Sequence, residues 1–308
     1  MHSFPEHKRF AFTIFDDTDM STLENTQPVY DLLGELGLRT TKSAWPLPRE
    51  CGRDMGSSLA DPAYLDFVRR LQKQGFEIGL HNVRSHPSPR AVTEQGIRVF
   101  QDRVGCNPTT FSNHDNNREN MYWGVLRLPT LPTQVAYRCA TAFLRRNYWE
   151  GHVEGSPFFW GDICQQNIRY VRNFAFDEIN LDKINPTMPY HEPSKPFVNL
   201  WFSSSNGGEV GAFCRILDEQ NQDRLEEEGG VCIIYTHFAY GFFEDGKMNR
   251  RFETLIRRIA KKNGWFVPTG TLLDHLHRER NGCNGIDPNE LTAMGHRWLL
   301  ERLRSGTA

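Results

Sequence analysis

The stretch FAFTIFDDTD, residues 10–19, places an apolar run directly before three carboxylates. Residues 10–15 are short, rich in Phe and nearly free of polar side chains, which predicts a strand buried on both faces. The chain then carries apolar residues at the i, i+3, i+4, i+7 spacing of one helix face, namely Val29, Leu32, Leu33 and Leu36. A buried strand followed by an amphipathic helix is the repeating unit of a parallel α/β fold.

The same unit recurs farther along the chain. FEIGL (76–80) is preceded by a helical apolar stripe, and VCIIY (231–235) is followed by one. Strands that alternate with helices predict a parallel sheet or barrel. We expect two of the helices to begin at capping residues close to a proline, at Thr26 and Asp61.

The chain length of 308 residues is ample for one large α/β domain, and we expect a single domain over 1–308. Residues from about 145 to 205 are rich in Pro, Asn and aromatic side chains and predict an irregular, loop-rich insertion around 197–202. Long loops on a compact scaffold often carry binding surface. Residues from about 287 to 304 predict a C-terminal amphipathic helix that packs on the outside.

The composition excludes several classes of partner. Lys+Arg is 36 and Asp+Glu is 38, so the net charge of -2 gives no field for nucleic acid or an anionic membrane. No run approaches the ~18 apolar residues of a membrane helix, and the first ten residues lack the apolar core of a signal peptide. The seven cysteines are scattered without a C-x-x-C pair. We therefore expect reduced thiols in a cytoplasmic protein that binds neither nucleic acid nor membrane.

Carboxylate or imidazole side chains follow four of the predicted strands. The carboxylates within 16–19 follow the first strand, and the other three strand ends carry His81, His114 and His237. In parallel α/β folds the ends of the strands meet at one edge. Two histidines and one carboxylate with open positions form a catalytic divalent-metal pattern, in which the metal activates water and polarises a carbonyl. A remaining aspartate could then accept a proton, and His237 could protonate a leaving group.

The order of these motifs resembles the polysaccharide deacetylase family, also called carbohydrate esterase family four or NodB-like. IFDD (14–17) is similar to the family's T-F-D-D motif, LQKQGFEIGLH (71–81) to the approach to its histidine motif, and GVCIIYTH (230–237) to its late strand. The resemblance covers most of the first 115 residues and about 225–275. It implies a distorted (β/α) barrel with seven or eight strands.

The resemblance also implies an activity, the metal-dependent removal of an N- or O-acetyl group from a sugar or glycan derivative. A metal-bound water would be the nucleophile, Asp16 the base and His237 the acid. Asp17 and His81 would bind the metal. The third carboxylate, Asp19, is interpreted as a loop residue. The substrate would be a small molecule or an oligosaccharide.

The second metal histidine is left open between two residues. The family separates its two metal histidines by three residues, whereas HNVRSH (81–86) has four between them. Either His86 binds on a bulged loop, or it points away and His114 from the neighbouring strand end, or a water, completes the shell. The expected ion is Zn²⁺, with Ni²⁺, Co²⁺ or Mn²⁺ as alternatives, because sites of histidine and carboxylate accept several divalent ions.

The substrate motif of the family, R-x-x-P followed by an aromatic residue, has no clear counterpart. TTFSNHDNNRENMYWG (109–124) instead offers amides that can bond hydroxyl groups and rings that can stack on the apolar faces of a sugar. FFWGD (158–162) reverses an Asp–Trp pair of the family. The expected substrate-binding residues are Asn113, Arg118, Tyr122, Trp123, Trp160 and Asp162.

Two alternatives stay open because of these departures. The same barrel and metal could hydrolyse a small, non-sugar amide. A degenerate, non-catalytic barrel could instead bind a sugar or a partner.

Overall fold

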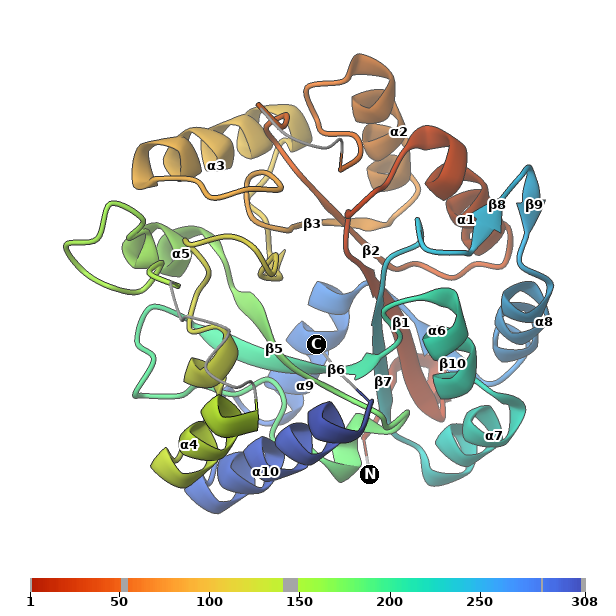
Figure 1. Cartoon of the computed structure of the whole chain (residues 1–308). Coiled ribbons are helices and arrows are strands. Elements are labelled where there is room, and N and C mark those ends of the chain that lie inside the picture. The colour runs from red at the N-terminus through yellow and green to blue at the C-terminus, as the bar shows by residue number, and fades with distance from the viewer. Residues whose placement is uncertain (1, 51–54, 141–148, 284, 306–308) are drawn as a thin grey trace.

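A barrel of parallel strands forms the centre of the computed structural model, which describes residues 2–50, 55–140, 149–283 and 285–305. The eight-stranded sheet has the order β10-β1-β2-β3-β4-β5-β6-β7, and an additional pairing of β1 with β7 closes a seven-strand barrel. Helices surround it on the outside (Figure 1). The predicted (β/α) barrel is therefore confirmed. The strands are β1 Phe10–Asp16, β2 Thr41–Ala44, β3 Glu77–Leu80, β4 Thr110–Phe111, β5 Tyr170–Phe176, β6 Leu200–Asn206, β7 Val231–Thr236 and β10 Gly264–Phe266.

The remaining elements lie outside the barrel. The short strands β8 (Phe243–Glu244) and β9 (Lys247–Met248) form a separate hairpin, and short 3-10 helices are η1 Pro5–His7, η2 Gly124–Arg127 and η3 Leu181–Lys183. The α-helices are α1 Leu23–Glu35, α2 Pro62–Lys73, α3 Arg90–Val104, α4 Leu131–Ala140, α5 Gly161–Asn167, α6 Val210–Ile216, α7 Glu219–Glu228, α8 Arg250–Ile259, α9 Thr269–Glu279 and α10 Pro288–Ser305.

Strand β1 explains the distortion of the barrel. It pairs with β7 along one edge, while β10 pairs with its first three residues and β2 with its last two, Phe15 and Asp16, along the other. All seven side chains of β1 are buried. The end of β1 thus lies between β2 and β7, and the loop that follows it starts at the C-terminal edge of the barrel.

One of the two predicted helix caps is found in the structure and the other is not. Asp61 caps α2 as predicted, with Oδ1 accepting from the backbone N–H groups of Ala63 and Tyr64. The prediction of a cap at Thr26 is wrong, because α1 begins one turn earlier, where Thr22 and Asn25 form a reciprocal capping box. The hydroxyl of Thr26 instead donates to the carbonyl of Thr22 inside the helix.

The segment expected to be a loop-rich insertion contains two barrel strands. β5 lies within residues 149–205, the described part of that segment, and β6 begins there and ends one residue beyond it, whereas 145–148 fall outside the described residues. The helix α10 covers the expected C-terminal helical stretch and contacts β5 and α4. Figure 1 shows it lying beside α4 at the edge of the molecule.

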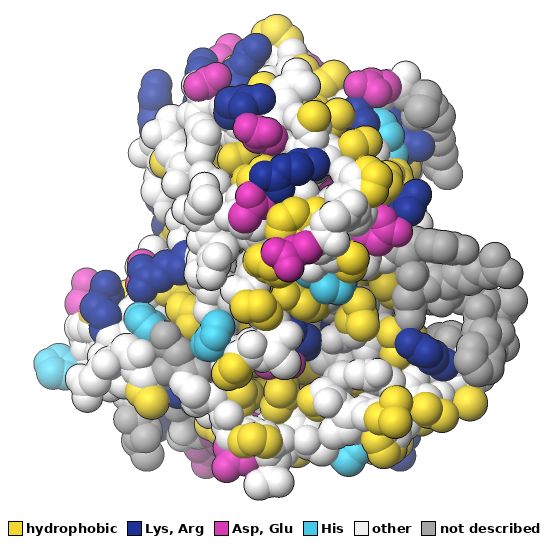
Figure 2. All heavy atoms as spheres, turned by 90° about the vertical axis from the view of Figure 1, so that its left-hand side faces the viewer, with side chains coloured by type: hydrophobic (Ala, Val, Ile, Leu, Met, Phe, Trp, Pro, Cys, Tyr) yellow, Lys and Arg dark blue, Asp and Glu magenta, His cyan; other side chains and the backbone are white. Residues whose placement is uncertain are grey.

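The surface agrees with the balanced composition. On the face around α3, α5 and α4, Figure 2 shows acidic and basic side chains interspersed with each other. Among the described residues, no helix combines the length and the apolar character needed to cross a membrane. The six described cysteines are all free thiols.

Candidate metal centre

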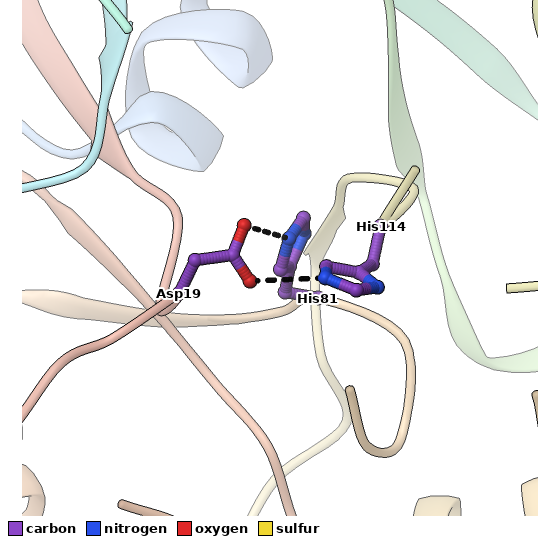
Figure 3. Close-up of side chains that lie close together, drawn as sticks. All are labelled: Asp19, His81 and His114. Carbon is purple, nitrogen blue, oxygen red and sulfur yellow. Dashed lines mark ion pairs between the residues drawn. The ribbon is translucent and has the colours of Figure 1, made fainter. Parts of the chain in front are cut away.

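Loops at the C-terminal ends of β1, β3 and β4 bring Asp19, His81 and His114 together. The ligand atoms of these three residues all lie within 4.8 Å of one another. Asp19 Oδ1 is 3.2 Å from His114 Nε2, and Asp19 Oδ2 is 3.6 Å from His81 Nε2. Figure 3 shows the two oxygens of Asp19 facing the two imidazole rings. From the end of β7, His237 Nε2 approaches the same carboxylate, 3.3 Å from Asp19 Oδ2.

The ring of His81 is held through its other nitrogen. Nδ1 lies 2.7 Å from the hydroxyl and 3.1 Å from the carbonyl oxygen of Ser112. The Ser112 hydroxyl donates its hydrogen to Asp17 Oδ1 at 2.7 Å. Both Ser112 oxygens therefore accept, and His81 Nδ1 carries the hydrogen. The lone pair of the neutral ring is then on Nε2, which faces Asp19.

The ring of His114 is oriented in the same way by an amide. The Asn117 Nδ2 group donates to the carbonyl oxygens of Arg84 and His86 and to Glu119 Oε1. These acceptors fix the amide orientation, so Asn117 Oδ1 accepts from His114 Nδ1 at 2.9 Å. The lone pair of a neutral His114 is again on the Nε2 that faces Asp19.

His237 completes this pattern, because its Nδ1 donates to the carbonyl oxygen of Gly208 at 2.7 Å. All three imidazoles thus give Nδ1–H to a protein acceptor and turn Nε2 toward one carboxylate. A metal-ligating histidine is typically held by such a hydrogen bond from its other ring nitrogen.

A divalent ion fits the donor set of Asp19, His81 and His114. His81 Nε2 is buried and has no hydrogen-bond partner among the described residues, which is costly for a polar atom unless a ligand satisfies it. Histidine nitrogen and carboxylate oxygen are the donors that zinc and similar ions bind in catalytic sites. The carboxylate is available as an anion, because the imidazole partners outweigh burial and lower the pKa of Asp19 well below its usual range.

The pKa values of the two histidines nearest to Asp19, His114 and His237, are raised, whereas that of Asp19 is lowered. Burial alone would lower the pKa of His114, but the Asp19 carboxylate raises it above its ordinary value. The pKa of His237 is also raised despite burial, by Asp19 and then Asp17. Without an ion, the carboxylate of Asp19 therefore favours the protonated forms of His114 and His237.

Asp17 lies beside this cluster and forms an ion pair with Arg172. Its Oδ2 accepts from Arg172 Nη2 at 2.5 Å and its Oδ1 from Arg172 Nη1 at 3.1 Å. Asp17 Oδ1 is also 3.7 Å from His81 Nδ1. Burial would raise the pKa of Asp17, but Arg172 and then the nearby histidines lower it below its ordinary value. Asp17 is therefore an anionic carboxylate next to the cluster.

Asp16, the last residue of β1, has a different environment. Both Asp16 and Lys42 are fully buried, and Lys42 Nζ lies 3.0 Å from Asp16 Oδ2. The hydroxyl of Tyr30 donates to Oδ2 at 3.0 Å, and the backbone N–H of Phe238 donates to Oδ1 at 2.9 Å. Burial alone would lower the pKa of Lys42, but Asp16 raises it above its ordinary value. The structure thus places Asp16 in an ion pair that joins β1 to β2.

His86 does not belong to the described group of close ligand atoms. The chain turns immediately after His81, where Asn82 has a φ of 49°, a left-handed conformation that Asn tolerates well. Asn82 Oδ1 accepts from the backbone N–H of His114 at 2.6 Å. The residue after His81 thus positions His114 in the group.

A cavity of about 320 Å³ opens beside the cluster. Asp17, Asp19, His81 and His237 line it, together with aromatic side chains that include Trp123. Its volume lies at the low end of the range for small-molecule pockets, roughly 300–1,000 Å³.

The six expected substrate-binding residues divide into two groups. Asn113 and Trp123 belong to the described lining of the cavity, and the other four do not. Those four have other contacts: Arg118 pairs with Glu150, the ring of Tyr122 packs at a tilt against His152, Trp160 donates to the carbonyl of Glu119, and Asp162 pairs with Arg90.

Several residues of the site were not singled out from the sequence. The sequence pattern predicts only a loop role for Asp19, and it does not indicate Ser112, Asn117 or Arg172. The spacing Asp17-x-Asp19 is the sequence signal that could have indicated a second carboxylate on the same side of the loop. An arginine within YVRNFAF (170–176) is a further signal, because a charged residue inside a buried strand needs a partner.

Comparisons with known proteins support the fold. No protein-family model matches the sequence, and no curated protein matches it. Among solved structures, a putative polysaccharide deacetylase from Mycobacterium smegmatis is similar at 11% identity and a TM-score of 0.50, over 91% of this chain and 94% of that one. Puue allantoinase is similar at 13% identity and a TM-score of 0.50, over 89% of this chain and 92% of that one. The chain therefore has the (β/α) barrel of polysaccharide deacetylase-like structures, as the motifs predicted.

Proposed function

We propose that this chain is a divalent-metal-dependent hydrolase that removes an acetyl group from a small sugar derivative. The proposal rests on the shared orientation of three histidines around Asp19. Three imidazoles, of His81, His114 and His237, are each anchored through Nδ1 and turn Nε2 toward Asp19 at the C-terminal edge of the barrel. Active sites of (β/α) barrels lie at this edge.

The metal would be held by Asp19, His81 and His114. A bound divalent ion would lower the pKa of a water and polarise a carbonyl, which is what hydrolysis of an amide or ester requires. In this assignment Asp19 has the role that the resemblance gave to Asp17. His114, and not His86, is the second histidine. Zn²⁺ remains the expected ion, with Ni²⁺, Co²⁺ and Mn²⁺ as alternatives.

Asp17 is a better candidate than Asp16 for the general base. Asp17 lines the cavity and stays anionic beside Arg172. Asp16 is not among the described residues of the cavity lining, and its oxygens are occupied by Lys42, Tyr30 and a backbone N–H. A general base must come within hydrogen-bond reach of the proton that it accepts.

His237 keeps the role of general acid. It lines the cavity, and the neighbouring carboxylates raise its pKa despite burial. A protonated Nε2 in this position can donate to a leaving amine or alcohol, while Nδ1–H stays on Gly208.

The cavity volume also favours a second candidate function, the hydrolysis of a small, non-sugar amide. About 320 Å³ accommodates a small molecule or one sugar unit. The two structural neighbours are described as a putative polysaccharide deacetylase and an allantoinase, so both kinds of substrate belong in the assay.

The test is acetate release from N-acetylglucosamine and its oligomers, and ammonia release from simple amides. The protein is assayed after chelation and after Zn²⁺, Ni²⁺, Co²⁺ or Mn²⁺ is restored. We expect activity only with metal, and a loss of roughly 10²–10⁴-fold in Asp17→Asn. The matched control is Asp102→Asn, on the outer helix α3. Full activity in the chelated protein would refute the proposal, and no metal uptake would support the non-catalytic alternative.

A further inference from the structure

The wall of the cavity contains three arginines, Arg127, Arg172 and Arg302. Arg172 forms an ion pair with the carboxylate of Asp17. The guanidinium of Arg302 lies 5.5 Å from the ring centre of Trp298 and 5.8 Å from that of Tyr137. Arg127 differs from Arg172, because no described residue accepts a hydrogen bond from its guanidinium or forms an ion pair with it.

Arg127 is nevertheless buried. Only 2% of its surface is exposed, and its Nε is buried without a hydrogen-bond partner among the described residues. A buried charge is costly unless it is paired and hydrogen-bonded. Burial, and then the charges of Arg302 and Arg172, lower the pKa of Arg127 to about 9, so the side chain is still a cation at neutral pH.

Aromatic rings hold the guanidinium in place. Its carbon lies 3.3 Å from the ring centre of Trp123 and 5.3 Å from that of Trp298. These contacts offset part of the cost of burial, and they engage the flat face of the group. The N–H edge of a stacked guanidinium remains available for a planar, bidentate contact with an oxyanion.

Asp115, a carboxylate in the same cavity lining, forms no described ion pair with Arg127. Asp115 also lines the cavity and accepts from Trp123 Nε1 at 3.3 Å. Its charge opposes the lowering of the Arg127 pKa, yet the two side chains form no described ion pair. The cavity lining therefore contains a cation without an ion-pair partner among the described residues, in addition to Asp19, His81 and His237.

We infer that Arg127 binds an anionic oxygen group, a carboxylate or a phosphate, carried by a substrate in the cavity that Arg127 lines together with Asp19 and His81. The inference rests on the proposed function and narrows its substrate class to small acylated molecules that carry such a group. Arg127 would position this group while the amide or ester faces the cluster.

The test is binding, measured by calorimetry on chelated protein, so that it does not depend on hydrolysis. The probes are two matched pairs, N-acetylglycine against N-acetylglycinamide and N-acetylglucosamine 6-phosphate against N-acetylglucosamine. We expect the wild-type protein to bind at least one charged probe about tenfold or more tightly than its neutral partner. The better pair identifies the carboxylate or the phosphate as the preferred group.

Variants assign the preference to Arg127. Arg127→Met should abolish the preference for the charged probe, Arg127→Lys should keep part of it, and Arg98→Met, on an exposed surface pair with Glu94, should leave it unchanged. Without ligand, Arg127→Met should unfold at the same or a higher temperature, because a buried unpaired charge is removed.

Three results would overturn the inference. The first is equal binding of charged and neutral probes to the wild-type protein, which needs no variant. The second is a preference that survives in Arg127→Met. The third is a markedly lower unfolding temperature of Arg127→Met, which would indicate a structural role. Charged-probe binding through Arg127 without any hydrolysis would instead count against the proposed activity alone.

Discussion

Replacing Asp16 by Asn tests whether this residue is structural or catalytic. Asn keeps the size of the side chain and one oxygen, which can still accept from the backbone N–H of Phe238. An amide NH₂ then replaces Oδ2, which accepts from Tyr30 and lies 3.0 Å from Lys42, so the charge opposite Lys42 is removed. Both partners of the pair are 0% exposed. Breaking a buried pair on one side costs about 3–5 kcal/mol, because the other charge stays buried without compensation. At about 2 °C per kcal/mol for a chain of this size, Asp16→Asn should unfold roughly 6–10 °C below the wild type.

The assay is a double-mutant cycle followed by thermal and urea unfolding. Lys42→Met should also be destabilised, and Asp16→Asn combined with Lys42→Met should recover most of the lost stability, because no unpaired charge is left. The double variant should also bind metal and hydrolyse substrate within about tenfold of the wild type, since neither residue contacts the substrate in our assignment.

Two results would contradict a structural role for the pair of Asp16 and Lys42. If the double variant folds and binds metal but loses hydrolysis by roughly 10²–10⁴-fold, Asp16 is the general base that the family resemblance implied. A double variant no more stable than the less stable single variant would show that the two charges do not depend on each other.

Two further predictions concern the surroundings of the site. Asn117→Ala removes the acceptor that holds His114 Nδ1, and a chelator competition titration should show metal affinity about 10–100-fold weaker; unchanged affinity would contradict the orientation argued for His114. The pKa of His152 is lowered to about 4, first by burial and then by the charge of Lys195. Because the unfolded chain takes up this proton near the ordinary pKa of about 6.5, the free energy of unfolding should fall as the pH drops from about 6.5 to about 4. Urea unfolding across this range should give a shallower pH slope for His152→Gln, and equal slopes would argue against the lowered pKa.

The sequence predicted the barrel because its clearest strands are short, mainly apolar runs. β1 and β7 are wholly buried, β3 is buried except for the half-buried Glu77, and the stripe after β7 becomes the buried face of α8. β5 was missed because YVRNFAF contains Arg172 and Asn173, which are buried in the barrel and break the apolar pattern. A strand whose polar side chains serve a site does not show the periodicity of a buried strand.

The sequence correctly places the candidate site at the C-terminal edge of the barrel. It assigns Asp17 to the metal, however, whereas the structure groups Asp19 with His81 and His114. His81, His114 and His237 follow strand ends, which hydrophobic patterns can locate. Asp19 lies in a loop, directly before Met20 with a φ of 57°. Side-chain directions in such a loop depend on tertiary contacts and not on the spacing of residues. For the same reason, a count of residues between His81 and His86 could not show that the chain turns at Asn82.

Metal content of purified variants tests whether Asp19, His81 and His114 hold the ion. The wild-type protein and three variants, Asp19→Asn, Asp17→Asn and His86→Asn, are loaded with zinc, freed of excess ion and measured by elemental analysis. We expect about one ion per chain in the wild type, Asp17→Asn and His86→Asn, and a loss of most of the metal in folded Asp19→Asn. Full occupancy in Asp19→Asn, together with loss in Asp17→Asn or His86→Asn, would contradict it.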